Sequence, residues 1–330
     1  MNMPLWNPHS PLLQAHACAL SIVVPVFNEQ ASLPLLQQRL LAALREVHET
    51  VEIVYVDDGS TDGSAQMLKQ LRAACPLVTV LRFSRNFGKE QALTAGLQMA
   101  RGEAVILMDA DLQHPPEHIP AMVAAWRAGA DVVSMRRTSR EDESWLKRRA
   151  AGAFYRTINR LSDIPIPDGV GDFRLFSRRA VDALNQLPER NRFMKGLFAW
   201  IGFEQVTLDY EVGARAAGET KWRFKQLWNF AVEGITAFSV APLKVATKLG
   251  MASAVMAFVF GLYSFIHALV YGDPVRGYPT LIVVVLMLGG LQLLAIGVLG
   301  EYIGRLSLES KRRPLFLIQA YEPATGFEVR

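Results

Sequence analysis

The segment Ala104-Val105-Ile106-Leu107-Met108-Asp109-Ala110-Asp111 carries the strongest indication of the fold. Its five apolar residues end abruptly in two carboxylates, and this pattern predicts a buried strand whose end opens into a binding site. Two carboxylates at a strand end can share one hard cation, and such a cation can hold a diphosphate. The alternative is a solvated acidic turn, and the flanking sequence decides between the two.

Strand and helix patterns alternate on both sides of this segment. Apolar, β-branched runs predict strands over 21–26, 51–56, 78–83, 104–108 and 131–135. Apolar residues at helical spacing predict one helix that ends at Leu71 and others over 33–44, 91–100 and 119–128. This alternation predicts an α/β domain with an open, mostly parallel sheet that helices cover on both faces.

Polar clusters follow three of the predicted strands, at Asn28-Glu29, Asp57-Asp58 and Asp109-Asp111. Ligands of open α/β sheets bind outside the carboxyl ends of the strands, so we expect these clusters to converge on one crevice. No Gly-x-Gly-x-x-Gly follows the first strand, and the sequence contains no Walker loop. These absences argue against a dinucleotide dehydrogenase and against a P-loop NTPase.

Composition adds a membrane signal to the α/β pattern. The chain has 330 residues, 51% of them apolar and 20% charged, with a formal net charge of +4. The apolar excess concentrates after about residue 230, where a membrane segment is expected. Basic residues cluster at 136–160, 221–225 and 311–313, which favours phosphate groups or an anionic membrane over nucleic acid, because no nucleic-acid-binding motif accompanies them. Cys18 and Cys75 show no metal-ligand spacing and fit a reducing cytosolic compartment.

Two uncharged apolar runs, 249–270 and 280–300, are each roughly 20 residues long and can cross the hydrocarbon core as helices. Basic residues stand at both outer flanks, and the positive-inside rule therefore places these flanks and the α/β domain in the cytoplasm. Before the first run, residues 224–238 form an apolar helical stripe beside three basic residues, which predicts an interfacial helix, with a core-packed helix as the alternative.

Small residues on the predicted spans favour close helix packing, within one chain or between copies of a homo-oligomer. Ser253, Ala257 and Gly261 form such a stripe, and Glu301 and Arg305 are spaced to pair. The predicted organisation is an N-terminal extension (1–19), the α/β domain (20–222), interfacial helices (223–247), two transmembrane helices (248–271 and 279–304) and a cytoplasmic tail (305–330).

Several motifs resemble those of the inverting family 2 glycosyltransferases, which have the GT-A fold and use nucleotide sugars. They are Val24-Pro25-Val26-Phe27-Asn28-Glu29, Val56-Asp57-Asp58-Gly59-Ser60, Asp109-Ala110-Asp111-Leu112-Gln113 and Arg215-x-x-Gly218-x-Thr220-Lys221. Within this family the chain is most similar to polyprenyl-phosphate glycosyltransferases of the bactoprenol (undecaprenyl-phosphate) glucosyltransferase group. That similarity rests on Phe83-Ser84-Arg85-Asn86-Phe87-Gly88-Lys89-Glu90, Val170-Gly171-Asp172-Phe173-Arg174-Leu175 and Gly297-Val298-Leu299-Gly300-Glu301-Tyr302-Ile303-Gly304-Arg305.

The resemblance implies roles for individual residues. The nucleoside positions are Pro25, Phe27, Glu29, Val56 and Asp58, with Phe27 standing where many relatives carry Tyr; a helix N-cap is the alternative role for Asp58. The metal and diphosphate positions are Asp109, Asp111 and Gln113, whose oxygens suit Mg²⁺ or Mn²⁺. The basic positions around the reacting phosphates are Arg137, Arg215 and Lys221, with Arg148 or Arg149 in addition.

Asp172 occupies the position of the general base of other family 2 members. A phosphate acceptor is already largely dianionic at neutral pH, because its second pKa is near ~6. It needs no strong base, so we expect Asp172 to orient the acceptor or Arg174, with base catalysis and a structural Asp172–Arg174 pair as alternatives. His114, beside Pro115-Pro116, is expected to be a polar loop residue rather than a ligand.

The resemblance implies a multi-pass enzyme of the inner membrane that moves glucose from UDP-glucose to undecaprenyl phosphate with inversion. Its product would serve as a donor for O-antigen or another envelope glycan. GlcNAc, galactose or an aminoarabinose derivative are alternative sugars. Two spans offer little structure for a flippase path, and the intact Asp109, Asp111 and Gln113 set argues against a non-catalytic scaffold. The expected partners are a UDP-sugar, a polyprenyl phosphate, the membrane and further copies of the chain, and not nucleic acid.

Overall fold

The computed structural model describes residues 18–137, 170–190, 192–210, 241–271 and 277–329. The chain divides into two compact units. One contains the described residues up to 210 and the segment 314–329. The other contains two long helices, α9 (Ala241–Tyr271) and α10 (Tyr278–Ser310).

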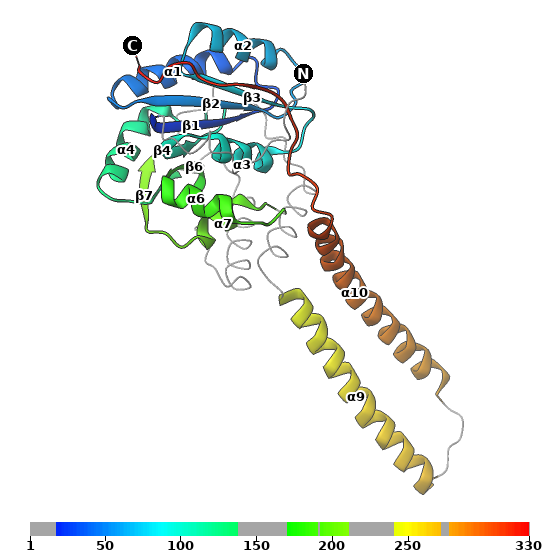
Figure 1. Ribbon diagram of the computed structural model, residues 1–330. Helices are drawn as coiled ribbons and strands as arrows, with labels where there is room; N and C mark the ends of the chain where they lie inside the picture. Colours follow the sequence, from blue (N-terminus) through cyan, green and yellow to red (C-terminus); the bar gives the residue numbers. More distant parts are fainter. Residues whose placement is uncertain (1–17, 138–169, 191, 211–240, 272–276, 330) are drawn as a thin grey trace. The chain divides into compact units, whose positions relative to one another are not determined.

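One sheet organises the first unit (Figure 1). Its strands are β1 (Cys18–Val26), β2 (Val51–Asp57), β3 (Val78–Phe83), β4 (Gly102–Leu107), β5 (Val132–Arg137), β6 (Val170–Ser177), β7 (Gln205–Tyr210) and β8 (Ile318–Glu322). They lie in the order β7-β5-β6-β4-β1-β2-β3-β8. Only β6 and β8 run antiparallel to their neighbours, so the predicted mostly parallel sheet is confirmed.

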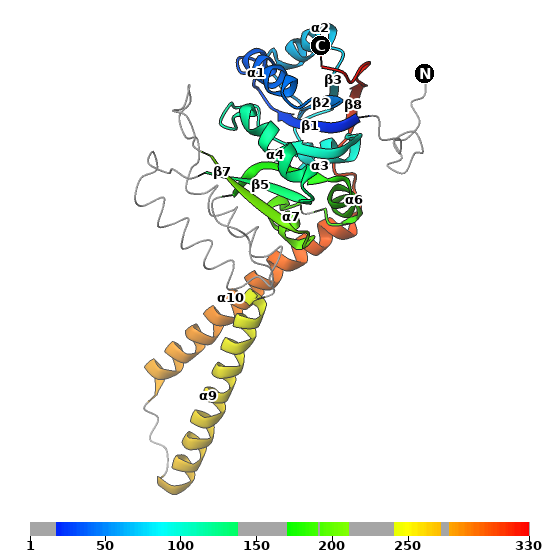
Figure 2. The ribbon, with the colours of Figure 1, turned by 90° about the vertical axis from the view of Figure 1, so that its left-hand side faces the viewer.

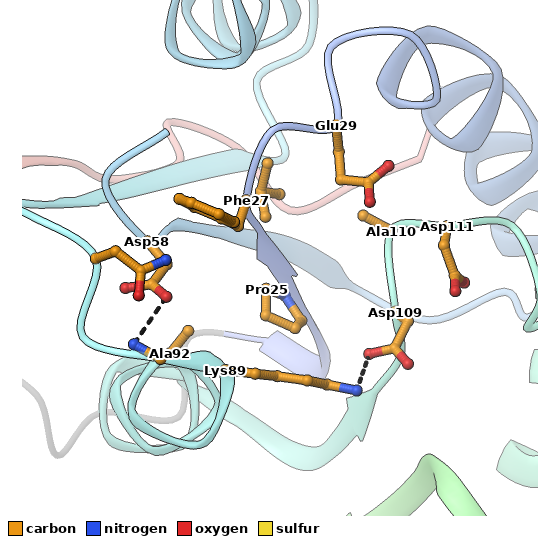
Figure 3. A pocket seen from close by; sticks show the side chains of 12 residues that line it. Pro25, Phe27, Glu29, Asp58, Lys89, Ala92, Asp109, Ala110 and Asp111 are labelled. Carbon is orange, nitrogen blue, oxygen red and sulfur yellow. Dashed lines mark hydrogen bonds and ion pairs between the residues drawn. The ribbon is translucent and has the colours of Figure 1, made fainter. Parts of the chain in front are cut away.

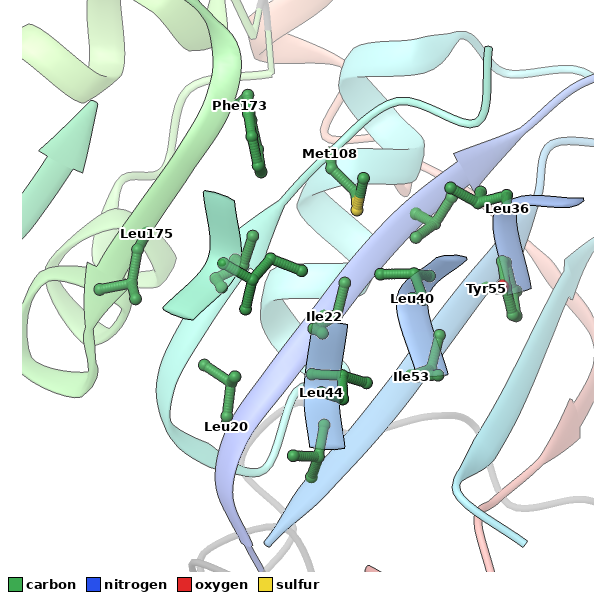
Figure 4. Packing of buried hydrophobic residues seen from close by; sticks show 14 of the residues in the cluster. Leu20, Ile22, Leu36, Leu40, Leu44, Ile53, Tyr55, Met108, Phe173 and Leu175 are labelled. Carbon is green, nitrogen blue, oxygen red and sulfur yellow. The ribbon is translucent and has the colours of Figure 1, made fainter. Parts of the chain in front are cut away.

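Helices pack against both faces of the sheet because β1 is almost entirely apolar and is buried on both sides. On one face Leu20, Ile22 and Val24 join a core with α1 (Leu33–Arg45), α2 (Ser64–Ala74) and α4 (Ile119–Arg127), part of which Figure 4 shows. On the other face α3 (Lys89–Met99) lies against β1. A Cβ on Gly96 of α3 would lie 2.1 Å from a methyl carbon of Val23, so only glycine permits this approach.

Shorter elements complete the first unit. They are the 3₁₀ turn η2 (Pro116–His118), α6 (Arg178–Gln186) and α7 (Met194–Trp200). The five predicted strands and four predicted helices are all present, with small differences at their ends. The sequence pattern did not predict β6, β7 or β8.

Strand β8 lies within residues 305–330, the segment expected to be a cytoplasmic tail, and gives part of it a regular structure. Helix α10 continues to Ser310, and Ile318–Glu322 then pairs antiparallel with β3, with Val80 opposite Glu322. The strand escaped prediction because it has only five residues, which alternate between half-buried and exposed positions and include Gln319 and Glu322. So short a run gives too few repeats for a periodicity to be recognised.

The second unit exposes its apolar side chains. Helices α9 and α10 contact each other and run in opposite directions (Figure 2). The side chains of Phe258 and Leu293 are each 71% exposed. Val245–Tyr263 and Met287–Ser310 are long and apolar enough to cross a membrane. The predicted pair of Glu301 and Arg305 is confirmed at 2.9 Å, whereas most of the predicted interfacial segment 223–247 lies outside the described residues.

Candidate active site

The three polar clusters that follow β1, β2 and β4 meet at one pocket of about 420 Å³ (Figure 3). Six residues singled out from the sequence line it: Pro25, Phe27, Glu29, Asp58, Asp109 and Asp111. They come together because the carboxyl ends of adjacent parallel strands lie at one edge of the sheet. The predicted convergence is therefore confirmed.

Asn28 ties the end of β1 to the loop that follows β2. Its side-chain oxygen accepts hydrogen bonds from the backbone amides of Thr61, at 2.8 Å, and Asp62, at 3.3 Å. Its own backbone lies in the left-handed region (φ 57°), a conformation that Asn tolerates better than most residues. The neighbouring Glu29 faces into the pocket. Burial raises the pKa of its carboxyl, a hydrogen bond from Ser32 partly offsets this, and the charge of Asp111 adds to the rise.

Asp58 fastens the end of β2 to the loop that follows β3. Its two carboxylate oxygens accept hydrogen bonds from the backbone amides of Phe87, at 2.6 Å, and Gly88, at 2.9 Å. The alternative role of Asp58 as a helix N-cap is wrong, because Gly63 precedes α2 and the nearby cap-like bond runs from the Ser64 amide to Asp62. Asp58 therefore shapes the pocket through the opposite loop.

Lys89 connects the strand-end carboxylates to Asp172. Its ammonium nitrogen lies 2.6 Å from Asp109 Oδ1 and 2.6 Å from Asp172 Oδ2. Burial disfavours the lysine charge, but the two carboxylates raise the pKa of Lys89 above its ordinary value. Burial also opposes ionisation of Asp172, yet Lys89 and Lys195 lower the pKa of that carboxyl to about 2. The ammonium and the two carboxylates form a charged bridge across the pocket edge.

Asp172 contributes to this bridge from strand β6, which runs antiparallel to β4. It lies near the start of β6, and Leu107 of β4 is opposite Arg174. The sequence suggested that Asp172 orients the acceptor or Arg174, whereas in the structure Asp172 forms its ion pair with the Lys89 ammonium. Arg174 is 1% exposed, donates its Nε to the Gly171 carbonyl at 3.0 Å and lies over the ring of Phe198.

His114 lies in the loop that follows β4, as expected, and its side chain is buried. It is 8% exposed, and its ring stacks on Phe173 with centroids 5.2 Å apart. Its Nδ1 accepts a hydrogen bond from the Asp109 amide at 3.1 Å, so the neutral ring carries its proton on Nε2. His114 therefore holds the backbone of the first carboxylate in place.

Sequence reasoning also assigned no role to Lys89 and Glu90, at the start of α3. Burial and the charge of Asp172 raise the pKa of Glu90 to about 8, although the Lys89 charge and a hydrogen bond from the Met194 amide oppose the rise. Both residues come shortly after the carboxyl end of β3. The strand-end rule that predicted the other three clusters would have found them if applied to this strand.

Several predicted site residues are not part of the pocket lining. Val56 is fully buried within β2, and Gln113 contributes its backbone amide to Asp111 Oδ1 at 3.1 Å. Arg137 ends β5, but its side chain is outside the described part of the structure. The remaining basic positions also lie outside the described residues: Arg148, Arg149, Arg215 and Lys221.

Comparisons with known proteins cover both units. Glycosyl transferase family 2 matches residues 21–184, and the GtrB C-terminal hairpin matches residues 241–306. The chain is 47% identical over 304 residues to a bactoprenol glucosyl transferase of Shigella phage SfV, with 91% of this chain and 98% of that protein covered.

The chain is also 45% identical over 304 residues to a prophage bactoprenol glucosyl transferase homolog of Escherichia coli (strain K12), and the match covers 91% of this chain and 98% of that protein. Among solved structures, the chain is similar to glucosyl-3-phosphoglycerate synthase from Mycobacterium tuberculosis, with 20% identity, a TM-score of 0.47, and 72% of this chain and 83% of that chain covered. Because the match to the phage and prophage proteins runs through both the sheet unit and the apolar hairpin, the chain belongs to glycosyl transferase family 2 and is a glycosyltransferase.

Proposed function

We propose that the enzyme transfers glucose from UDP-glucose to undecaprenyl phosphate at the cytoplasmic face of the inner membrane. The observation that carries this proposal is the near full-length similarity to proteins named bactoprenol glucosyl transferases, at 45–47% identity. The pocket and the apolar hairpin supply the two features that such a reaction requires. One receives a charged, soluble donor, and the other brings the protein to a lipid acceptor.

The pocket has the size and lining that a nucleotide sugar needs. Its volume of about 420 Å³ lies within the usual range for small-ligand sites. Phe27 is 45% exposed there, and its ring offers a stacking surface for a uracil base. Glu29 and Asp58 present carboxylates to the hydroxyl and N–H donors of the nucleoside. Phenylalanine at position 27 removes the hydroxyl contact that a tyrosine would supply.

Asp109 and Asp111 fit a divalent cation that the donor brings with it. In the described residues no group of three acidic, histidine or cysteine side chains is arranged to enclose a metal. Mg²⁺ does not require such a cage, because it is commonly held by one or two carboxylates together with substrate phosphates and water. When bound, Mg²⁺ or Mn²⁺ would neutralise charge that develops on the leaving diphosphate. Gln113 stays a candidate for an additional oxygen contact.

The acceptor supplies its own nucleophile. An oxygen of the phosphate monoester forms the bond to the anomeric carbon, the bond to the UDP oxygen breaks, and UDP leaves with that electron pair. One such displacement inverts the configuration. No proton has to be removed during the reaction, because the phosphate monoester loses its second proton with a pKa of about 6 and is already a dianion at neutral pH. Asp172, with a pKa of about 2, is poorly matched to base catalysis at neutral pH and instead fixes Lys89 beside Asp109.

Cations are needed where a diphosphate and an incoming phosphate approach each other. Lys89 supplies one at the pocket, and we assign the others to Arg137, Arg215 and Lys221. The basic flanks of the hairpin favour a cytoplasmic sheet unit. A homo-oligomer stays part of the proposal: a Cβ on Gly261, Gly300 or Gly304 would meet no atom within 4 Å, so these positions are open to a second helix.

The decisive experiment is a transfer assay with the full chain, undecaprenyl phosphate and a panel of labelled UDP-sugars, with products identified by mass. We expect a hexosyl phosphate lipid from UDP-glucose, loss of activity with EDTA and recovery with Mg²⁺ or Mn²⁺. Preferred use of UDP-GlcNAc, UDP-galactose or UDP-aminoarabinose would change the assigned sugar. No transfer from any donor would contradict the proposed enzyme and favour a scaffold.

A further inference from the structure

The loop between β3 and α3 forms one wall of the donor pocket. Asn86 and Gly88 line the pocket from this loop, and Lys89, the first residue of α3, lines it directly after them. Lys89 also forms the charged bridge to Asp109 and Asp172. The position of this loop therefore affects the donor pocket and the charged bridge together.

One side of the loop is held by residues that follow β2. Asp58 accepts the amide hydrogens of Phe87 and Gly88. Gly59, with φ at +67°, lies so close that a Cβ there would be 2.4 Å from the Arg85 carbonyl carbon. Any larger residue would push the loop away, so the second strand end sets one limit of the wall.

The other side is held by the segment that follows α10. The Ser84 amide donates a hydrogen bond to the Leu317 carbonyl at 3.0 Å. The Phe316 ring stacks on Phe83, with centroids 5.0 Å apart and planes 10° from parallel. Phe83 in turn meets the ring of Phe87 edge-on at 5.7 Å. The rings of Phe316, Phe83 and Phe87 thus connect the C-terminal segment to the pocket wall, because Phe87 stands between the pocket-lining residues Asn86 and Gly88.

We propose that Phe316 is a positioning residue of the donor site. Through Phe83 and Phe87 it holds the β3–α3 loop in the conformation that receives the nucleotide, and it thereby sets the affinity for the donor. The inference rests on the proposed UDP-sugar donor. It assigns a binding function to a segment that the sequence pattern marks only as a tail.

The segment has other attachments that keep it on the sheet without the Phe316 ring. The Ala324 amide donates to Thr79 Oγ1 at 2.9 Å, and the Thr325 amide donates to the Pro76 carbonyl at 2.9 Å. Arg72 pairs with Glu322 at 3.5 Å. A substitution at Phe316 is therefore expected to loosen the loop while β8 stays paired.

The test measures the dissociation constant of UDP by calorimetry on the full chain in detergent with excess Mg²⁺, alongside KM and kcat for UDP-glucose. Phe316→Ala should weaken UDP binding by roughly twofold to thirtyfold, the range that corresponds to coupling energies transmitted through packed side chains. Its kcat at saturating donor should stay within about twofold, since bound donor restores the loop. The neighbouring Leu317→Ala is the control, because that side chain is 54% exposed.

Phe316→Leu decides the matter if the alanine variant does not fold, because it retains apolar volume but removes the aromatic stack. Folded Phe316 variants that bind UDP as tightly as the wild type would overturn the proposal. A fall in kcat at unchanged KM would also overturn it. If the wild-type protein itself does not bind UDP, the proposed donor fails together with this inference, a result that no Phe316 variant can imitate.

Discussion

Asp109 and Asp172 reach the same lysine from strands that run in opposite directions. Asp109 follows the carboxyl end of β4, where Glu29, Asp58 and Asp111 are also gathered. Asp172 lies at the beginning of β6, which brings its first residues to that edge only because it is antiparallel. The parallel side is thus rich in carboxylates that can hold a donor, whereas the β6 side contributes one carboxylate whose described partner is a cation.

This difference indicates that the carboxylates after the parallel strands and Asp172 on β6 have different functions in the site. Residues on the parallel side are expected to act on the charge of the donor, and their loss should reduce turnover most. Asp172 is expected to orient Lys89, so its loss should cost less. The substitutions below test this comparison, beginning with the largest expected effect.

Asp111→Ala should abolish transfer, with a fall in kcat of about 10³-fold or more, because it removes a carboxylate proposed to hold the divalent cation at the leaving diphosphate. The variant should remain folded and membrane-bound. Asp182→Ala, at a side chain 56% exposed on α6, is the matched control and should retain activity. Near-normal turnover of the Asp111 variant at saturating metal would show that the carboxylates after the parallel strands do not take part in catalysis.

Lys89→Met should lower kcat by about 10²-fold, since Asp109 and Asp172 would lose their shared cation. Lys89→Arg should recover part of the activity because it retains the charge. Lys69→Met, at an exposed position of α2, serves as the control. Steady-state kinetics on all three proteins provides the measurement, and equal activity of the Met variant and the control would show that the bridge is dispensable.

Asp172→Asn should keep measurable turnover, with a loss below about tenfold, and the same acid limb of the pH–rate profile as the wild type. That limb should lie near ~6, where the acceptor phosphate takes up its second proton. The measurement is kcat against pH. A collapse by about 10² or more would instead identify Asp172 as the general base, and the displacement without a base would have to be withdrawn.

Glu90→Gln should change stability more than catalysis. The pKa of Glu90 rises from its usual value of 4.5 to about 8 in the folded protein. Between these values the folded state binds more protons than the unfolded state, so the free energy of unfolding falls as pH rises. Thermal unfolding should therefore show a steeper loss of stability from about pH 5 to about pH 8 in the wild type than in the variant, by about 1 kcal/mol or more. Parallel curves would refute a buried, protonated Glu90.

The sequence alone predicted the site residues that follow the parallel strands, but it did not predict the partners of Asp172 on β6. Apolar runs that end in Asp57-Asp58 or Asp109 predict both a strand and its functional end, because one rule of topology links them. Asp172 was found only through a family resemblance, which suggested that it orients the acceptor or Arg174 and gave no indication of Lys89. The residue that pairs with it depends on which strand lies beside β4, and local periodicity contains no information about that neighbour.

The pairing of β8 with β3 has a consequence for how the protein is made. Until β8 arrives, β3 is an edge strand with unpaired backbone groups, the kind of surface that invites association with other chains. The ribosome delivers β8 only after α9 and α10, because both helices precede it in the sequence. Domains generally begin to fold during synthesis, so the sheet waits incomplete while the hairpin emerges. The wall of the donor pocket that the C-terminal segment holds is thus completed only after both helices of the hairpin have been synthesised.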